Sequence, residues 1–448
     1  MTITPLMRTI HHVVNITGLR GLTLALAVLY SVPTHAATTI WAGTQGGVYE
    51  SIDSGATWQA VTVVVTDPLL RGTDPPTPNV AAIALDPQQP STVYFVGQMQ
   101  GSSGLGFYRS ADSGKTWTSV LLIGIPITFP VSFETTWILV DPVLTNVIYL
   151  GTTGEVAKST DYGATWTRLT LPTLPNSGGN TATPDGLSVD PNASGVIYLS
   201  ALPRVFKSID FGNAWTLLTP VVANQSGGHR LGNVIVDPKN SSVLYVGSSG
   251  ASLQFTCGPP NAQQPCGLFR SADGGQSWNS VGPGGEYNEV VFDSRTSDLY
   301  VSGRVVGASV LKSTDGGNTW NPISNMGAYH LIADPGASAS LFGFQSWNSP
   351  VFVKSTDGGV TFTEGFIVTT GLKRDVIALA VPRAPSPRTG DCNSDGSVTV
   401  DELLTLVNIA LGNLPVTTCE AGDANHDNEI TIDEILAAVN NALIGPGC

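Results

Sequence analysis

The chain has 448 residues, of which 42% are hydrophobic and only 12% are charged, and its net charge is −14. This composition excludes a globally disordered chain, and the excess of acid argues against nucleic acid or an anionic membrane surface as partner. The 50 glycines and 30 prolines suit many short strands joined by turns.

The first 36 residues have the features of a secretory signal. Arg8 and Arg20 precede an apolar run from Leu22 to Tyr30, and the small-residue stretch that ends at Ala36 follows it. The run is shorter than the roughly 20 residues that span a bilayer. We therefore expect cleavage after Ala36 and a secreted chain, extracellular or periplasmic, with no membrane span after cleavage.

A segment that first reads Ser51-Ile-Asp-Ser-Gly-Ala-Thr-Trp58 occurs seven times. The later copies are Ser110–Trp117, Ser159–Trp166, Ser208–Trp215, Ser271–Trp278, Ser313–Trp320 and Ser355–Phe362. Its Asp can accept from backbone N–H groups two or more residues on, and its Gly supplies the positive φ of a tight turn. The aromatic residue at its end can fill the space between two sheets. Because these roles are structural, we do not take the seven aspartates as catalytic candidates.

Upstream of six copies lies an apolar segment that ends in Asp, mostly Asp-Pro, and then a second segment that contains Tyr or Phe. Trp137 to Pro142 followed by Val147 to Gly151 is one example. β-branched and aromatic runs split by turn residues indicate hairpins. Each unit then has four strands, and the box aspartates recur every 42 to 63 residues, near the roughly 40 to 50 residues of a propeller blade.

The repeated segment has the Ser-x-Asp-x-Gly-x-Thr-Trp pattern of the Asp-box or BNR repeat, and residues 37–381 resemble the Asp-box β-propellers. The first unit lacks its Asp-Pro strand, and an orphan apolar strand, Asp375 to Val381, follows the last unit. Placing the orphan in the first blade removes two open sheet edges. We therefore predict an all-β seven-bladed propeller closed by a C-terminal strand.

The box turns and Asp-Pro turns should lie at one face of the propeller, and longer, variable loops at the other, where function tends to lie. Aligning the units on Asp-Pro brings seven residues to one place, just before the innermost strand. These candidate ligand-binding rim positions are Asn79, Glu134, Thr183, Arg230, Glu286, Gly327 and Arg374. We expect Trp137, Asp185, Tyr287, His330 and Trp347 nearby.

A proline-rich linker, residues 382–390, leads to an acidic tail, residues 391–448, with ten acidic residues and no Lys or Arg. The tail contains two copies of a twelve-residue calcium loop, 391–402 and 423–434, each leading into an amphipathic helix (Glu402 to Leu411 and Glu434 to Leu443). Oxygen ligands for two Ca²⁺ ions are expected at positions 1, 3, 5, 7, 9 and 12. They are Asp391, Asn393, Asp395, Ser397, Thr399 and Glu402 in the first loop and Asp423, Asn425, Asp427, Glu429, Thr431 and Glu434 in the second. The alternative is a pair of acidic helix caps in a solvated tail.

The spacing and tandem order of the two loops resemble dockerin modules, a tandem EF-hand family that binds a cohesin partner. Dockerin loops often carry small hydroxyl residues at positions 10 and 11, whereas this chain has Val400-Asp401 and Ile432-Asp433. A structural or surface-attachment role therefore stands beside cohesin binding. The pseudo-twofold of such modules implies a Cys392–Cys448 pair that leaves Cys419 free. Elsewhere, Cys257 and Cys266 bracket a short loop that a disulfide would close.

Asp-box propellers include sialidases, xyloglucan-cleaving glycosidases, sortilin-like receptors and a photosystem II assembly factor, so the fold does not decide the function. The Arg-Ile-Pro motif of sialidases is missing. The xyloglucan-cleaving enzymes use two propellers, with a catalytic Asp from each, where this chain has one. We expect a non-enzymatic binding or scaffold protein for a glycan or protein. The alternative is a glycoside hydrolase, for which Glu134, Asp185 and Glu286 are the candidate carboxylates.

Overall fold

The structure of the protein is a computed structural model. It describes residues 38–63, 78–99, 106–121, 137–152, 154–174, 181–201, 204–218, 229–250, 267–282, 285–293, 295–305, 308–324, 329–334, 339–344, 351–366, 376–380, 389–392, 398–423 and 429–444. The expected signal, most of the linker and several variable loops lie outside these ranges.

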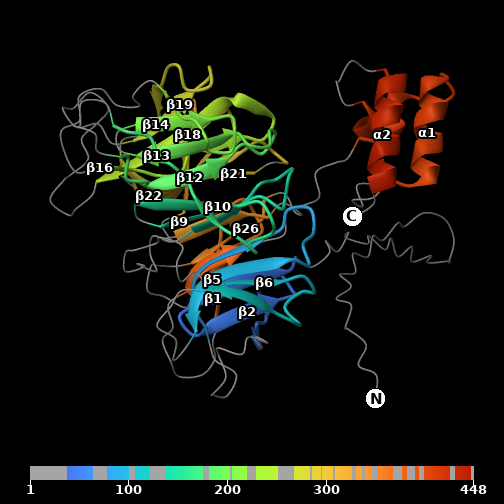
Figure 1. The fold of residues 1–448 in the computed structure, drawn as a ribbon. Coiled ribbons are helices and arrows are strands. Elements are labelled where there is room, and N and C mark those ends of the chain that lie inside the picture. Colours follow the sequence, from blue (N-terminus) through green and yellow to red (C-terminus); the bar gives the residue numbers. More distant parts are fainter. Residues whose placement is uncertain are drawn as a thin grey trace, which may run out of the picture. The chain divides into compact units, whose positions relative to one another are not determined.

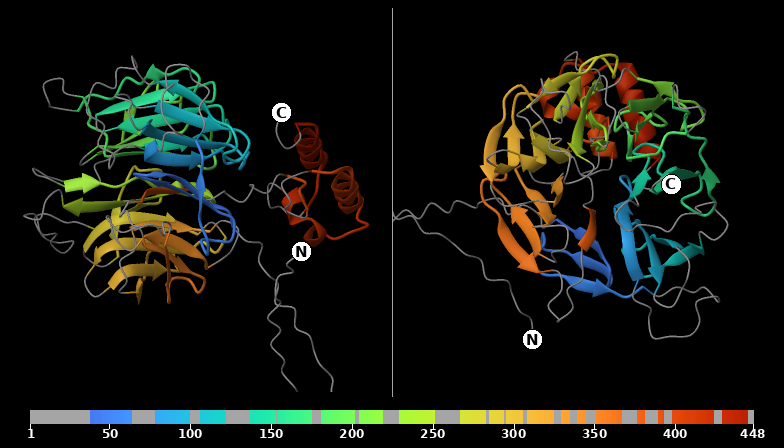
Figure 2. Two further views of the ribbon diagram at one scale, coloured as in Figure 1. Left: turned by 90° about the horizontal axis from the view of Figure 1, so that it is seen from below. Right: turned by 90° about the vertical axis from the view of Figure 1, so that its left-hand side faces the viewer.

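The described part of the chain before residue 381 folds into seven antiparallel sheets, six of four strands and one of five. Figure 2 shows the sheets arranged as blades around a ring, which is a seven-bladed β-propeller. The strands of blades 1 to 4, after the closing strand β29 (Val376–Ala380) of blade 1, are β1 (Ile40–Thr44), β2 (Gly47–Ser51), β3 (Gln59–Val61), β4 (Pro78–Leu85), β5 (Val93–Met99), β6 (Gly106–Ser110), β7 (Thr118–Leu121), β8 (Trp137–Val140), β9 (Ile148–Thr152), β10 (Glu155–Ser159), β11 (Thr167–Arg168), β12 (Gly186–Val189), β13 (Ile197–Ala201), β14 (Arg204–Ser208) and β15 (Thr216–Leu217). Those of blades 5 to 7 are β16 (His229–Leu231), β17 (Ile235–Asp237), β18 (Asn240–Gly250), β19 (Leu268–Ser271), β20 (Asn279–Val281), β21 (Gly285–Phe292), β22 (Leu299–Val305), β23 (Ala308–Ser313), β24 (Asn321–Ser324), β25 (Tyr329–Ala333), β26 (Leu341–Phe344), β27 (Val351–Ser355) and β28 (Thr363–Phe366).

The first blade takes strands from both ends of the propeller sequence. β29 pairs antiparallel with β1, with Trp41 opposite Ala380 and Gly43 opposite Ala378. This is the partner that the orphan apolar segment was predicted to find. Leu379 is buried in the cluster that joins this blade to blade 7.

Hydrophobic clusters between neighbouring blades form the core. One cluster takes Tyr94 and Phe107 from blade 2 and Ile148 and Leu150 from blade 3. Both faces of each sheet are covered by a neighbour, which explains why the inner strands read as continuous apolar runs rather than as alternating ones. The box aromatic residues pack into these clusters as predicted, with Trp117 only 2% exposed.

Six of the seven box turns share one full hydrogen-bond pattern, seen first in Ser51 to Trp58, and the fourth lacks only the hydroxyl bond because it has Ala214 in place of Thr or Ser. Asp53 Oδ1 accepts from the Ser51 hydroxyl and from the Thr57 N–H, both at 2.8 Å, and Asp53 Oδ2 accepts from the Thr57 hydroxyl at 2.6 Å. The Gly55 N–H donates to Ser51 Oγ at 2.8 Å. The predicted turn chemistry is confirmed, because a short carboxylate satisfies donors four residues on and Gly55 has a φ of +84°.

Box turns and Asp-Pro turns lie at the same end of each blade, as predicted. The Tyr162 N–H of the third box turn donates to the Asn146 carbonyl, and the Phe211 N–H of the fourth donates to the Gly195 carbonyl, both at 3.0 Å. A backbone hydrogen bond thus joins the two kinds of turn within a blade.

The tail contains two α-helices, α1 (Val400–Ala410) and α2 (Ile432–Ile444) (Figure 1). Two 3₁₀ helices, η3 (Val416–Thr418) and η4 (Glu420–Gly422), lie between them in the sequence. Both α-helices begin two residues earlier than predicted. In α1 the reason is a capping box between Thr399 and Glu402, which places Glu402 in the first turn. Leu406 of α1 and Ala438 of α2 are fully buried in the small core between them. Among the described residues, no helix has the length and apolarity needed to cross a bilayer.

Candidate functional site

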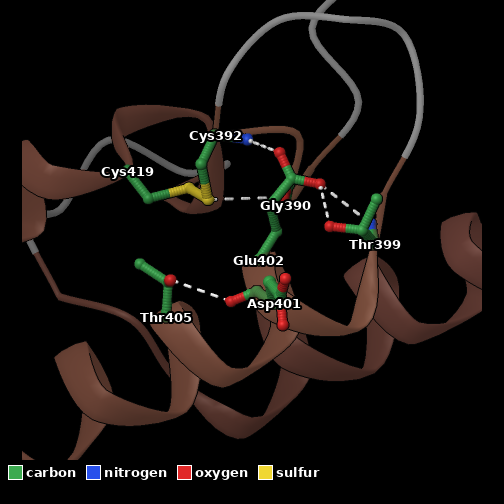
Figure 3. Close-up of a disulfide and its surroundings, with 7 residues drawn as sticks. All are labelled: Gly390, Cys392, Thr399, Asp401, Glu402, Thr405 and Cys419. Carbon is green, nitrogen blue, oxygen red and sulfur yellow. Dashed lines mark hydrogen bonds between the residues drawn. A yellow bond between two sulfur atoms is a disulfide. The ribbon is translucent and has the colours of Figure 1, made fainter.

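The carboxylate of Glu402 holds the two ends of the first acidic loop together (Figure 3). Its Oε1 accepts from the Cys392 N–H at 2.9 Å. Its Oε2 accepts from the Thr399 N–H at 2.8 Å and from the Thr399 hydroxyl at 2.9 Å. Positions 2, 9 and 12 of the loop thus meet at one carboxylate.

The second loop repeats the last part of this geometry. Glu434 Oε2 accepts from the Thr431 N–H at 2.8 Å and from the Thr431 hydroxyl at 3.1 Å. Two segments 32 positions apart in the sequence therefore fold in the same way at their helix starts. This is the expected result of the in-register repeat.

Four carboxylates of the two loops are buried. Asp391 is 1% exposed, Asp423 5%, Glu434 6% and Glu402 7%. No Lys or Arg lies between residues 391 and 448. Burying ionised carboxylates is costly unless positive charge or hydrogen-bond donors compensate. The four carboxylates offer oxygen atoms as ligands, and Ca²⁺ prefers oxygen ligands, so the residues present fit this ion.

Part of each loop lies outside the described residues, including Asn393, Asp395, Ser397, Asn425 and Asp427. Thr399, Glu429 and Thr431 are described and exposed. Within the described ranges, no three acidic, His or Cys side chains gather closely enough to hold a metal ion. The ligand sets predicted from the sequence therefore stay predictions.

The structure corrects the disulfide pairing of the tail. Cys392 is bonded to Cys419, with their Cα atoms 4.7 Å apart, so the expectation of a Cys392–Cys448 bond and a free Cys419 is wrong. The two segments that carry these cysteines also meet through the Gly390 N–H, which donates to the Ala421 carbonyl at 3.0 Å. Cys257, Cys266 and Cys448 lie outside the described residues.

Three of the predicted rim positions lie on the innermost strands rather than before them, whereas Thr183 lies before β12, as predicted. Asn79 is in β4 opposite Gln98, Arg230 is in β16 and Glu286 is in β21 opposite Arg304. These three strands start earlier than the apolar pattern predicted, because backbone pairing begins before the first residue of the apolar run. The side chains of Arg230 and Glu286, and all of Glu134, Gly327 and Arg374, are outside the described part.

Four described side chains belong to the predicted rim and its surroundings, and one of them, Thr183, is exposed. The Asn79 Oδ1 atom is buried and has no hydrogen-bond partner among the described residues. Asp185 is half-buried and its N–H donates to the Ser200 carbonyl at 2.8 Å. Trp137 packs directly over Gly151 in the neighbouring strand, which leaves no room for a side chain there. Of the three candidate carboxylates, only that of Asp185 belongs to a described side chain, so their predicted proximity stays a prediction.

A pocket of about 200 Å³ between blades 5, 6 and 7 was not anticipated from the sequence. Its polar lining includes Asn233 and Glu289, and its apolar lining includes Ile235 and Leu331. Glu289 Oε2 accepts from the Leu331 N–H at 2.7 Å and so joins blade 6 to blade 7. Glu289, an acid directly before the apolar run from Val290 to Phe292, was the signal that could have pointed to it.

No family model and no curated protein matches the chain. Among solved structures, a GH74 xyloglucanase from Xanthomonas campestris is similar at 16% identity and a TM-score of 0.46, with 79% of this chain and 56% of that one covered. YCF48 bound to D1 peptide is similar at 14% identity and a TM-score of 0.42, with 65% and 83% covered. A protein from Lactobacillus plantarum is similar at 14% identity and a TM-score of 0.48, with 77% and 99% covered.

The fold and the two loops define the class of the protein: a seven-bladed β-propeller followed by a small helical tail with two acidic loops. The chain spans 56% of the length of the xyloglucanase that it resembles. Identities of 14 to 16% leave its activity open.

Proposed function

We propose that the protein is an exported, non-enzymatic binding or scaffold protein whose tail binds two Ca²⁺ ions. The propeller presents its variable-loop face to a glycan or a protein, and the tail docks the chain to a partner. One observation supports the calcium part above all: four buried carboxylates lie in a segment without any basic residue.

The first ion would be held by Asp391, Asn393, Asp395, Ser397, Thr399 and Glu402, and the second by Asp423, Asn425, Asp427, Glu429, Thr431 and Glu434. When bound, calcium would supply the positive charge that the oxygen atoms of these residues coordinate. The chain's own residues position the carboxylates, since the contacts of Glu402 and Glu434 fix where each loop ends and each helix begins.

The tail also exposes apolar side chains along both helices, which supports docking. On α1 they are Val400, Leu404, Val407 and Leu411, three or four residues apart and therefore on one face. On α2 the equivalents are Ile432 and Leu436. Exposed apolar stripes of this kind mark interaction sites. The flanking charge is entirely acidic, so the matching partner, cohesin-like or on a surface, has an apolar groove with a basic rim.

The calcium proposal is tested by titrating the full chain with CaCl₂ in a calorimeter. We expect two bound ions per chain, and one each for Glu402→Gln and for Glu434→Gln. Glu364→Gln, an exposed acid in β28 of the propeller, is the matched control and should leave the count unchanged. Absence of heat with the unchanged chain contradicts the proposal.

Binding is distinguished from hydrolysis by incubating the chain with polysaccharides and aryl-glycosides. The binding proposal expects retention on a ligand without turnover. Turnover that is abolished by Glu134→Gln, Asp185→Asn or Glu286→Gln would replace it with the glycoside hydrolase alternative.

Docking is tested by titration with a cohesin domain in the presence of Ca²⁺. Leu404→Glu and Leu436→Glu place charge on the apolar stripes and should weaken binding, whereas Ile52→Glu, at an exposed apolar site in a box turn, should not. A binding constant that neither stripe substitution changes would refute docking through these helices.

A further inference from the structure

The Cys392–Cys419 disulfide joins the first acidic loop to the entrance of the second (Figure 3). Cys392 is the second residue of the first loop. Cys419 lies between η3 and η4, four residues before Asp423 at the start of the second loop. The hydrogen bond from the Gly390 N–H to the Ala421 carbonyl runs beside the disulfide. One covalent bond and one backbone hydrogen bond therefore hold the two loop entrances together.

Each loop entrance also packs on the helix that follows the other loop. Gly390 has a φ of +96°, and a Cβ placed on it would lie 2.5 Å from the Ala438 Cβ in α2. A Cβ on Gly422 would collide with the Leu406 side chain in α1. Neither entrance can move without disturbing the other loop's helix.

The disulfide acts on the two loops unequally. In the first loop, the Cys392 N–H donates to Glu402 Oε1, so the residue that carries the sulfur atom is hydrogen-bonded to the carboxylate at position 12. The second loop has Ala424 where the first has Cys392. Cys419 is 1% exposed, which anchors the far end of the bond in the tail core.

We infer that this disulfide is a redox control on calcium binding by the first loop, a conclusion that rests on the calcium binding proposed above. With the bond intact, Cys392 stays hydrogen-bonded to Glu402, so positions 1 and 12 of the loop stay near each other. A dithiol reductant transfers two electrons and two protons, the S–S bond becomes two thiols, and the reductant becomes a cyclic disulfide. Cys392 is then no longer tied to Cys419, and the apparent calcium affinity of the first loop falls in proportion to the fraction of chains that keep the binding-competent arrangement.

The coupling works in both directions. If the disulfide strengthens calcium binding, bound calcium must stabilise the disulfide by the same factor. Calcium bound to the first loop should slow reduction of Cys392–Cys419. Disulfide bonds form and persist in the oxidising compartments outside the cytosol. The first loop would thus gain full affinity only after the chain has been exported and oxidised.

The test is calorimetric titration of the full chain with CaCl₂, before and after reduction with dithiothreitol. In Glu434→Gln, which retains the first loop, we expect reduction to weaken the remaining site by about ten-fold. In Glu402→Gln, which retains the second loop, the change should be under about two-fold. Cys392→Ser/Cys419→Ser without reductant should reproduce the effect, which separates this bond from the other cysteines.

Equal calcium affinity of oxidised and reduced Glu434→Gln overturns the inference while leaving calcium binding intact. Failure of the oxidised, unsubstituted chain to bind calcium removes the proposed function itself. A second readout is the rate at which Cys419 becomes available to an alkylating reagent under reductant, followed by mass spectrometry of its peptide. This rate should fall about ten-fold in saturating calcium, and an unchanged rate contradicts the coupling.

Discussion

Asp141 and Gly195, 54 residues apart, connect two neighbouring blades through a hydrogen bond of 2.9 Å from the Gly195 N–H to Asp141 Oδ2. Asp141 Oδ1 accepts from the N–H groups of Val143 and Leu144 within its own turn. One carboxylate thus closes the Asp-Pro turn of blade 3 and ties it to blade 4. Asp334 makes a similar tie between blades 7 and 1, where its Oδ2 accepts from the Thr38 hydroxyl at 2.7 Å.

Asp141→Ala should lower the free energy of unfolding by about 3 kcal/mol, because it leaves one buried and two partly buried backbone N–H groups without an acceptor. Denaturant unfolding followed by Trp fluorescence measures the change. The exposed Glu364→Ala should stay within about 0.5 kcal/mol. A loss for Asp141→Ala no larger than that of the control would show that the inter-blade hydrogen bond is dispensable.

Leu379→Ala tests how much the closing strand contributes. The side chain is 8% exposed and packs between the first and last blades, so its removal should cost about 2 to 4 kcal/mol. Ile52→Ala, in the same blade but 62% exposed, serves as the control and should cost under about 0.5 kcal/mol. Similar unfolding midpoints for the two variants would mean that β29 adds little to the stability of the ring.

Ser113→Gly should stabilise the protein by roughly 0.5 kcal/mol. Ser113 has a φ of +55° between the Asp and Gly of the second box turn. A non-glycine residue there is strained by about 1 to 2 kcal/mol, which the greater flexibility of glycine in the unfolded chain partly offsets. Gly274 is the equivalent residue of blade 5, with a φ of +71° and no atom within 4 Å of the position that a Cβ would take. Gly274→Ser should therefore shift the melting temperature in the opposite direction, and shifts of the same sign would contradict the strain argument.

Glu50→Arg should stabilise blade 1. In six blades a Lys or Arg precedes the box Ser. The charged group of each lies 5.1 to 5.9 Å from the centre of an aromatic ring in its own or the next blade. Lys158, for example, lies 5.9 Å from the centre of the Phe211 ring. Blade 1 has Glu50 instead, opposite Trp41, and burial raises the pKa of its carboxyl group. An arginine over the Trp41 ring should add about 0.5 to 1 kcal/mol. Glu50→Gln is the control, because it removes the carboxylate without adding a cation. A melting temperature for Glu50→Arg no higher than that of Glu50→Gln would rule out a stabilising contact between the arginine and the Trp41 ring.

Stability should fall in acid between about pH 4 and pH 2. The pKa values of Asp112, Asp273 and Asp315 are lowered to about 2. The main cause is a hydrogen bond from the hydroxyl group four residues further on, and hydrogen bonds from backbone N–H groups add to it. In the unfolded chain these groups bind protons near pH 4, so the stabilisation is present above that pH and is lost as pH falls through the folded value. Melting temperatures measured across this window should show the decline, and a triple Asp→Asn variant should show a flatter one. An equally steep decline in the variant would assign the effect to other acids.

The amino-acid sequence was sufficient for features that depend on neighbours in the chain. The box turns, the Asp-Pro hairpins and the four-strand unit follow from hydrogen bonds that span at most a few residues and from β-forming composition. The repeat then fixes the number of blades, since each sheet needs a neighbour to cover its apolar faces. The twin acidic loops and the helices after them were readable for the same local reason.

Only the tertiary structure decided which distant groups meet. The second oxygen of Asp141 reaches Gly195, Glu289 reaches Leu331, and Cys392 pairs with Cys419 rather than with Cys448. None of these contacts has a local signature, because each depends on how one blade or loop packs against another. Sequence alone therefore determined the repeating unit and the chemical composition of its loops, whereas packing between units determined the ties that close the ring and the bond that couples the two acidic loops.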